Sequence, residues 1–269
     1  MRELVYVTEG RELHAEYFAG EAGAPLLIDI HGGGFCFGRA ADDRALCARL
    51  ARETGGCVAS FDYCLAPRYR YPAAHEDCRA LFEAVLADGA LSFDRRRVYV
   101  MGHSAGANLA VALARTGRAR GLVLNYPWLD LSQSRRKYFY ASIPAFVLSS
   151  FAKKYCKARD VRAKSELSPV HLAAEEAAKL PPTLIITGGS DSLRTDGIAF
   201  YEVLRSAGAD VRHVEYPAAR HGFIEMAASG RMKPNFYTSK RAAETQLACF
   251  EAAVGEIVTF LKSNDGGTT

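Results

Sequence analysis

The stretch YVMGHSAGANLAVALA, from Tyr99 to Ala114, places one serine between two glycines, where an apolar run ends and an alanine-rich run begins. The first run predicts a buried strand and the second a helix, so Gly102–Gly106 forms the turn between them. A tight strand-to-helix turn leaves no room for Cβ atoms beside its central residue, which explains both glycines. Ser104 is then expected at the carboxyl end of a strand, above a helix N-terminus that favours negative charge.

The composition is that of an ordinary globular protein. Of the 269 residues, 49% are hydrophobic and 24% are charged, and the formal net charge is +4. This length predicts a single domain spanning residues 1–269. The chain has neither a basic stripe with base-reading elements nor an apolar run of membrane-spanning length, so we expect no nucleic-acid or membrane partner. Basic clusters at 135–137 and 153–157 are interpreted as solvated faces.

The seven cysteines show no CxxC pair and no zinc-ligand spacing. An odd number of unpaired thiols fits a reducing compartment. The N-terminus lacks the uninterrupted apolar core of a signal peptide. These features predict a cytoplasmic protein whose chemistry requires no metal or cofactor.

Strand-like and helix-like segments alternate along the chain after an N-terminal hairpin centred on Glu9-Gly10. Strands are predicted at residues 25–30, 56–63, 97–101, 121–127, 183–189 and 211–217, and helices at 42–53, 72–88, 105–115, 195–207 and 241–261. Short, nearly continuous apolar runs are typical of parallel strands that are covered by helices on both faces. The predicted fold class is therefore α/β, with a mostly parallel central sheet and an antiparallel hairpin.

Residues 129–167 interrupt this alternation because they contain no clear strand, and residues 143–155 show helical apolar spacing. An insertion near the carboxyl ends of sheet strands is a candidate cap over a site. The alternative is a further packing helix without a cap role. Four aromatic side chains either line the pocket or form the core of the cap: Phe139, Phe146, Phe151 and Tyr155.

A serine hydroxyl is a poor nucleophile near neutral pH and needs a base that a third group orients. Asp191 follows a predicted strand, although it could instead cap the next helix, as Thr195 or Asp196 could. His221 lies in a loop after the last strand, where many histidines are merely solvated. The order serine, aspartate, histidine, each at the carboxyl end of a strand, is the order found in α/β-hydrolases.

A glycine-rich segment, IDIHGGGFCFG, directly follows a predicted buried strand. Consecutive glycines let backbone N–H groups turn inward and stabilise an oxyanion, and one such donor contributes about 3–4 kcal/mol to the transition state. A phosphate-binding loop is the alternative, but neither established phosphate-loop pattern is present. His103 is adjacent to Ser104 and cannot easily reach its hydroxyl, so we expect a packing or hydrogen-bonding role for it.

Several motifs occur in order between Pro25 and Phe223: HGGGF, FDYCLAP, YPAAHED, GHSAGANLA, YPWLD, DSL and HGF. With these motifs the sequence resembles the hormone-sensitive-lipase-like branch of α/β-hydrolase esterases, which includes bacterial acetyl esterases. The resemblance implies an α/β-hydrolase fold and the following roles. Ser104 is the nucleophile, His221 the base and acid, and Asp191 the orienting carboxylate. The backbone N–H groups of the oxyanion hole belong to Gly33, Gly34 and Ala105, and His31 shapes the glycine loop.

The sequence departs from the family pattern at the turn and in the cap. Family turns usually read GDSAGG, whereas this chain has His103 in place of the acid and Ala107 in place of the last glycine. Typical members also carry a longer segment before the glycine loop, which forms part of their cap. We therefore expect a reduced helical cap, for which residues 227–240 partly compensate.

The sequence predicts a serine carboxylesterase that hydrolyses short-chain esters, acetyl to butyryl, of a small molecule through an acyl-enzyme. Short chains are expected because a reduced cap offers little apolar wall. An amidase or deacetylase with the same residues is the alternative, and a non-catalytic ligand-binding protein on the same fold is a more distant one. A homodimer through an edge strand is expected from the resemblance only.

Overall fold

The computed structural model describes residues 1–8, 10–132, 142–233 and 239–265. Its sheet has eight strands in the order β1-β2-β4-β3-β5-β6-β7-β8. Their bounds are β1 Arg2–Thr8, β2 Arg11–Phe18, β3 Ala24–Ile30, β4 Cys57–Phe61, β5 Phe93–His103, β6 Gly121–Asn125, β7 Thr183–Gly188 and β8 Val211–Tyr216. Strands β3 to β8 are parallel, while β1 and β2 form an antiparallel hairpin that joins the sheet through β4.

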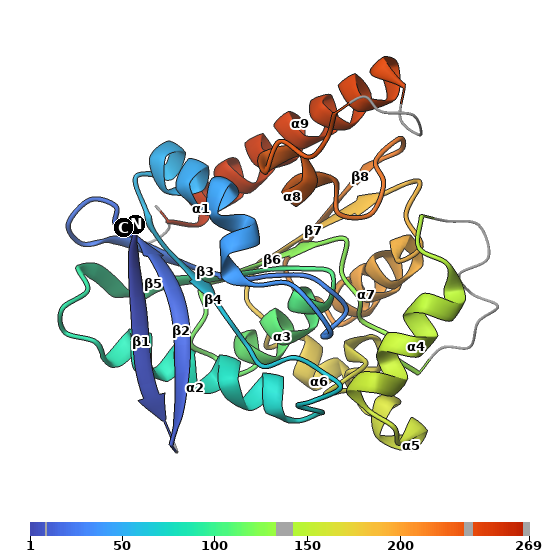
Figure 1. Ribbon diagram of the computed structural model, residues 1–269, viewed down its shortest axis with the longest axis horizontal. Helices are drawn as coiled ribbons and strands as arrows, with labels where there is room; N and C mark the ends of the chain where they lie inside the picture. Colours follow the sequence, from blue (N-terminus) through green and yellow to red (C-terminus); the bar gives the residue numbers. More distant parts are fainter. Residues whose placement is uncertain (9, 133–141, 234–238, 266–269) are drawn as a thin grey trace.

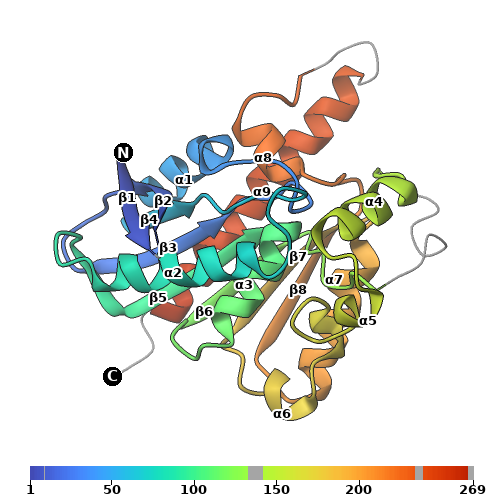
Figure 2. The same ribbon diagram turned by 60° about the horizontal axis from the view of Figure 1, so that its bottom comes forward.

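Helices cover both faces of this sheet (Figures 1 and 2). Their bounds are α1 Ala40–Thr54, α2 Ala73–Ala87, α3 Ala105–Ala114, α4 Ala145–Tyr155, α5 Arg159–Arg162, α6 Ala174–Ala177, α7 Arg194–Ser206, α8 Phe223–Ala228 and α9 Lys240–Asp265. One apolar core lies between the sheet and α1, α8 and α9, and the other lies between the sheet and α2, α3 and α7. The predicted layered α/β architecture is confirmed.

The central strands are apolar because both of their faces are covered. Every residue of β4, β6 and β7 is buried, and β3 is buried except at Pro25. Asp29 is the single charged residue of β3 and is completely inaccessible to solvent. Strand β8, at the edge of the sheet, has no fully buried residue: Arg212 is exposed and the others are partly buried. The ends of β3 and β5 that lead into the glycine loop and the turn are fully buried.

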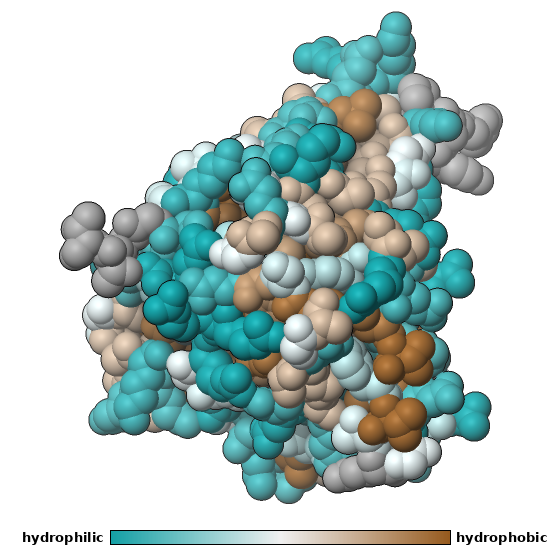
Figure 3. Space-filling view, turned by 90° about the vertical axis from the view of Figure 1, so that its left-hand side faces the viewer, coloured by the Kyte–Doolittle hydropathy of each residue, from teal (hydrophilic) through white to brown (hydrophobic). Residues whose placement is uncertain are grey.

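Strand β1 of the hairpin forms the other edge of the sheet. On β1, Leu4 is buried whereas Val5 and Val7 are 50% and 73% exposed. The surface on this side of the molecule is mostly hydrophilic, with apolar side chains in separate patches (Figure 3). No helix in the described residues is long and apolar enough to cross a membrane, and each of the seven cysteines is a free thiol.

The predicted elements differ from the structure mainly at their ends. Strand β5 begins at Phe93 rather than at Arg97, because its exposed polar residues 94–97 give no apolar signal. Helix α8 has no counterpart among the predicted elements. The helical spacing at 143–155 corresponds to α4, which lies beside α7 (Figure 2). Phe139 and the basic cluster at 135–137 lie outside the described residues.

Candidate active site

The turn between β5 and α3 holds Ser104 in a strained conformation, with φ 53° and ψ −114°. A Cβ on Gly102 would lie 2.3 Å from the carbonyl oxygen of Gly106, and one on Gly106 would lie 2.1 Å from the carbonyl oxygen of Ile30. Both distances are shorter than any real contact, so only glycine fits at either position. The backbone N–H of Ser104 donates to the carbonyl of Asn125 at 2.9 Å, which ties the turn to β6.

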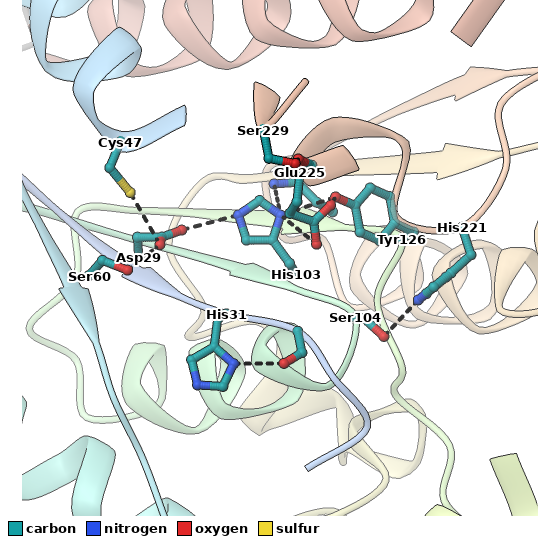
Figure 4. Close-up of polar contacts among 12 residues, drawn as sticks. Asp29, His31, Cys47, Ser60, His103, Ser104, Tyr126, His221, Glu225 and Ser229 are labelled. Carbon is teal, nitrogen blue, oxygen red and sulfur yellow. Dashed lines mark hydrogen bonds and ion pairs between the residues drawn. The ribbon is translucent and has the colours of Figure 1, made fainter. Parts of the chain in front are cut away.

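The structure brings the three predicted side chains together at the carboxyl ends of β5, β7 and β8. His221 Nε2 lies 2.9 Å from Ser104 Oγ (Figure 4). His221 Nδ1 lies 2.8 Å from Asp191 Oδ2. The other carboxylate oxygen of Asp191 accepts the backbone N–H of Leu193 at 2.8 Å. With Nδ1–H directed at the aspartate, Nε2 is free to accept the proton of the serine hydroxyl.

The alternative roles suggested for these positions find no support in the geometry. Helix α7 begins at Arg194, and no side chain caps its N-terminus. Asp196 accepts instead the backbone N–H groups of Leu129 and Asp130, at 3.2 and 3.0 Å. Asp191 is 5% exposed and bonded to His221, so neither residue is merely a solvated loop group.

The glycine loop passes directly beside Ser104. Gly33 and Gly34 have left-handed φ values of 112° and 61°, and a Cβ on Gly33 would lie 1.9 Å from the carbonyl oxygen of Phe37. The loop closes on itself because the N–H groups of Cys36 and Phe37 both donate to the carbonyl of Gly33. Ala105 is the first residue of α3, so its N–H has no acceptor within the helix.

The side chain of His31 contacts the backbone of this loop. Its Nδ1 lies 2.7 Å from the carbonyl oxygen of Gly32, and its ring stacks on Tyr63 with centroids 4.1 Å apart. Burial lowers the pKa of His31, which keeps the imidazole neutral. The contacts are those of a side chain that shapes the loop, as predicted for it.

A cavity of about 410 Å³ opens above Ser104 and His221. On one side its wall is apolar and includes Phe37, Trp128 and two residues of α4, Leu148 and Phe151. The ring of Phe151 lies against the glycine loop, since a Cβ on Gly34 would come within 2.5 Å of it. Phe151 and Phe37 meet edge to face at 4.9 Å. Helix α4 thus narrows the cavity next to the glycine loop.

The other aromatic residues expected near the site lie elsewhere. Phe146 is 63% exposed and does not line the cavity. Tyr155 is buried in the core, where it stacks on Phe35 at 4.0 Å. Of the four aromatic candidates, only Phe151 lines the cavity among those that the structure describes.

A cluster of charged side chains lies next to the site. The sequence predicts a packing or hydrogen-bonding role for only one of them, His103. His103 is fully buried, with Nε2 3.1 Å from Asp29 Oδ1 and Nδ1 3.2 Å from the hydroxyl of Tyr126. Glu225 Oε1 lies 3.7 Å from the same Nδ1, and Glu225 Oε2 accepts the hydroxyl of Tyr126. Asp43 lies nearby, and burial raises its pKa well above the ordinary value.

Among the described residues, Asp29, Asp43 and His103 form a group with the donor set of a metal site, with ligand atoms within 4.8 Å of one another. In the structure His103 Nε2 is directed at Asp29 itself. When Nε2 carries the proton of this hydrogen bond, it has no lone pair to donate to a metal ion.

The chain matches the model of the α/β-hydrolase fold family over residues 27–225. The chain therefore belongs to the α/β-hydrolase family. Among curated proteins it is similar to the esterase LipI of Mycobacterium tuberculosis and to an ethyl acetate hydrolase of Pseudomonas putida. Each is 32% identical over 219 residues, which are 77% of this chain and 68% of the relative.

A similar solved structure is that of an esterase from the hyperthermophilic archaeon Pyrobaculum calidifontis. Its TM-score to this chain is 0.84 at 27% identity, and the match covers 97% of this chain and 85% of the esterase. The fold predicted from the sequence is confirmed by these comparisons. The family relationship predicted from the motifs is confirmed as well.

Proposed function

We propose that this protein is a serine carboxylesterase for small-molecule esters with short acyl chains, acetyl to butyryl. The observation that carries the proposal is the chain of contacts from Asp191 through His221 to Ser104, at 2.8 and 2.9 Å. The names of the relatives, esterase and ethyl acetate hydrolase, point to the same reaction.

In the proposed mechanism Ser104 attacks the ester carbonyl while His221 Nε2 takes the hydroxyl proton. The backbone N–H groups of Gly33, Gly34 and Ala105 stabilise the oxyanion, which the dipole of α3 also favours. His221 then protonates the leaving alcohol, and a water molecule that it activates hydrolyses the acyl-enzyme.

The preference for short chains is supported by the narrowing of the cavity beside the glycine loop rather than by a lack of apolar wall. Phe151 lies against the glycine loop, where the carbonyl oxygen of the substrate must bind, and Phe37 supports it from the side. We propose that residues 129–167, which include α4, act as a cap for this reason. The rings of Phe151 and Phe37 leave room for a small acyl group beside Ser104 and exclude a long one.

The test is hydrolysis of p-nitrophenyl esters from acetate to dodecanoate, by the native protein and by Ser104→Ala. The native protein is expected to act best on acetate to butyrate. The variant is expected to lose activity by roughly 10⁴-fold or more, because the nucleophile is gone. Equal efficiency on dodecanoate and acetate would contradict the short-chain preference, and unchanged activity in the variant would contradict the mechanism.

Amide hydrolysis remains the alternative reaction, since the same residues serve it and only leaving-group protonation differs. Native protein that a fluorophosphonate labels at Ser104 but that cleaves anilides faster than esters would favour an amidase. Folded native protein that does not react with the label would instead indicate ligand binding without catalysis.

A further inference from the structure

The residue before Ser104 in the turn is histidine, where family members usually have an acid, and it is enclosed by carboxylates. We propose that His103 is a positioning residue that is charged at neutral pH: Asp29 contacts its Nε2, Tyr126 contacts its Nδ1, and these contacts fix the tyrosine ring against His221 (Figure 4). This inference rests on the function proposed above, because it assigns His221 as the base.

The hydrogen bonds of Asp29 indicate that Nε2 of His103 carries a proton. Asp29 Oδ2 accepts the hydroxyl of Ser60 at 2.7 Å and the thiol of Cys47 at 3.3 Å. The carboxylate therefore acts as an acceptor, and its ionised form is favoured by these donors together with His103, which lower its pKa against the effect of burial. Oδ1 accepts from His103 Nε2 in the same way.

The contacts of Tyr126 indicate that Nδ1 of His103 carries a proton as well. The hydroxyl of Tyr126 donates to Glu225 Oε2, so its oxygen has a lone pair free toward His103 Nδ1 at 3.2 Å. A protonated Nδ1 fills that position and also faces Glu225 Oε1 at 3.7 Å. The side-chain amide nitrogen of Asn125 lies 3.3 Å from the same Nδ1. The amide oxygen has no hydrogen-bond partner among the described residues, so the amide turned through 180° accepts from a protonated Nδ1 as well. With both ring nitrogens donating, the side chain is an imidazolium ion.

The surrounding charges favour this ion. Burial alone lowers the pKa of His103, but Glu225 and the hydrogen bond to Asp29 outweigh burial and raise the pKa from 6.5 to about 10. Burial raises the pKa of Glu225 itself, and His103 opposes that shift. Because the pKa is raised, the charge is present throughout the acidic and neutral range and is lost only as the pH rises through about 10. The titratable groups that face the ring are Asp29 from β3, Asp43 and Cys47 from α1, Tyr126 after β6 and Glu225 from α8.

Tyr126 and Glu225 connect this ion with the reacting groups. The ring of Tyr126, held at an unusual φ of 38°, meets the ring of His221 edge to face at 5.2 Å. Glu225 Oε1 and Ser104 Cβ both lie 3.5 Å from the place where a Cβ on Gly32 would be. Loss of the charge on His103 is therefore expected to disturb the base and the glycine loop together.

The charge itself can be measured without any assay of activity. In protein labelled with ¹⁵N-histidine, His103 at about pH 8 should show two protonated ring nitrogens with imidazolium shifts, a state that an ordinary histidine has lost at this pH. His75 is the matched control within the same spectrum. Its Nε2 is also buried, but burial lowers its pKa to about 4, so it should be neutral. His103→Gln and His75→Gln assign the two signals.

The positioning role predicts a particular kinetic pattern in His103→Gln. The cation near His221 opposes protonation of the base, so without it the acid-side midpoint of kcat/KM should move to higher pH, by about 0.5 to 1 unit. We expect kcat to fall about tenfold to a hundredfold, with KM changed less than about threefold because His103 does not line the cavity. His75→Gln should leave both the midpoint and kcat unchanged.

A double-mutant cycle tests whether His103 and Asp29 act as a pair. His103→Gln leaves the carboxylate without its cation, and Asp29→Asn leaves the cation without its main anion, so each change lowers kcat. The double variant removes both charges and should be no worse than the poorer single variant. Far-UV circular dichroism and fluorophosphonate labelling confirm that each variant is folded.

Three results would overturn the inference: a neutral His103 at about pH 8, an unmoved acid-side midpoint in His103→Gln, or losses that multiply in the double variant. A stoichiometric metal ion bound in purified protein would also overturn it, since a metal on His103 replaces the Nε2 proton. Failure of the proposed function looks different. In that case native protein neither hydrolyses acyl substrates nor reacts with the label, while the NMR measurement still reports the charge.

Discussion

At the scale of single residues, the contacts of Asp191 divide its two carboxylate oxygens between separate tasks. Oδ1 accepts the backbone N–H of Leu193, which fixes the carboxylate, and Oδ2 is left to face His221. The aspartate thus selects the imidazole tautomer whose Nε2 is unprotonated and can accept the proton of Ser104.

Asp191→Asn is expected to lower kcat by about 10⁴-fold, because an amide N–H facing Nδ1 favours the wrong tautomer. Steady-state kinetics on p-nitrophenyl acetate measure the effect, and Ser190→Ala is the control because its hydroxyl faces the carbonyl of Pro217 rather than the site. A loss smaller than about tenfold would show that another group orients His221.

Some residues of the site could be predicted from the sequence and others could not. Ser104, Asp191 and His221 were predictable because each stands at the end of a strand with a recognisable turn or loop motif. Asp29 also left a signal, as the one charged residue in an otherwise apolar buried strand. Glu225 left none, since its contact with His103 depends on how α8 packs across the sheet, and no local pattern encodes that packing.

At the scale of elements, α4 and the glycine loop line the part of the cavity where we propose that the acyl group binds. The helix was predictable from its apolar spacing, which places Leu148, Phe151 and Tyr155 toward the protein. The spacing could not show which ring would reach the cavity, because Phe151 and Tyr155 lie on the same stripe. Only the packing of α4 against the glycine loop and Phe35 separates their roles.

Phe151→Ala is expected to shift the preferred acyl chain of the substrate from acetate and butyrate toward hexanoate and octanoate. Removing the ring opens space beside Gly34, and an alkyl chain that fills it gains about 0.8 kcal/mol per buried CH₂. The kcat/KM profile across p-nitrophenyl esters measures the shift. Phe146→Ala on the same helix should keep the native profile because that ring points to solvent.

At the scale of the whole molecule, the three side chains proposed to react follow strands that are buried to different degrees. Strand β5, which leads to Ser104, is central and buried in its second half, whereas β8, which leads to His221, is a partly buried edge strand. Edge elements with few buried contacts open at lower free energy than central ones. The loop that carries the base is therefore the part of the site with the least support.

In a urea titration, hydrolysis of p-nitrophenyl acetate is expected to fail before the far-UV circular dichroism signal changes. The reason is that local opening of β8 removes His221 from Ser104 while most of the sheet persists. Coincident midpoints for the two signals would contradict this and would indicate a single cooperative transition.

Dimerisation through an edge strand stays a prediction. A dimer of this kind would protect the edge strand that it covers from local opening.

The contact between His103 and Asp29 joins neighbouring strands, β5 and β3, in a place that water does not reach. A change at either position alone leaves one charge buried without its counterpart, which costs several kcal/mol. An acidic residue at position 103 would place two carboxylates side by side in this part of the core, so such a change requires a second change at position 29.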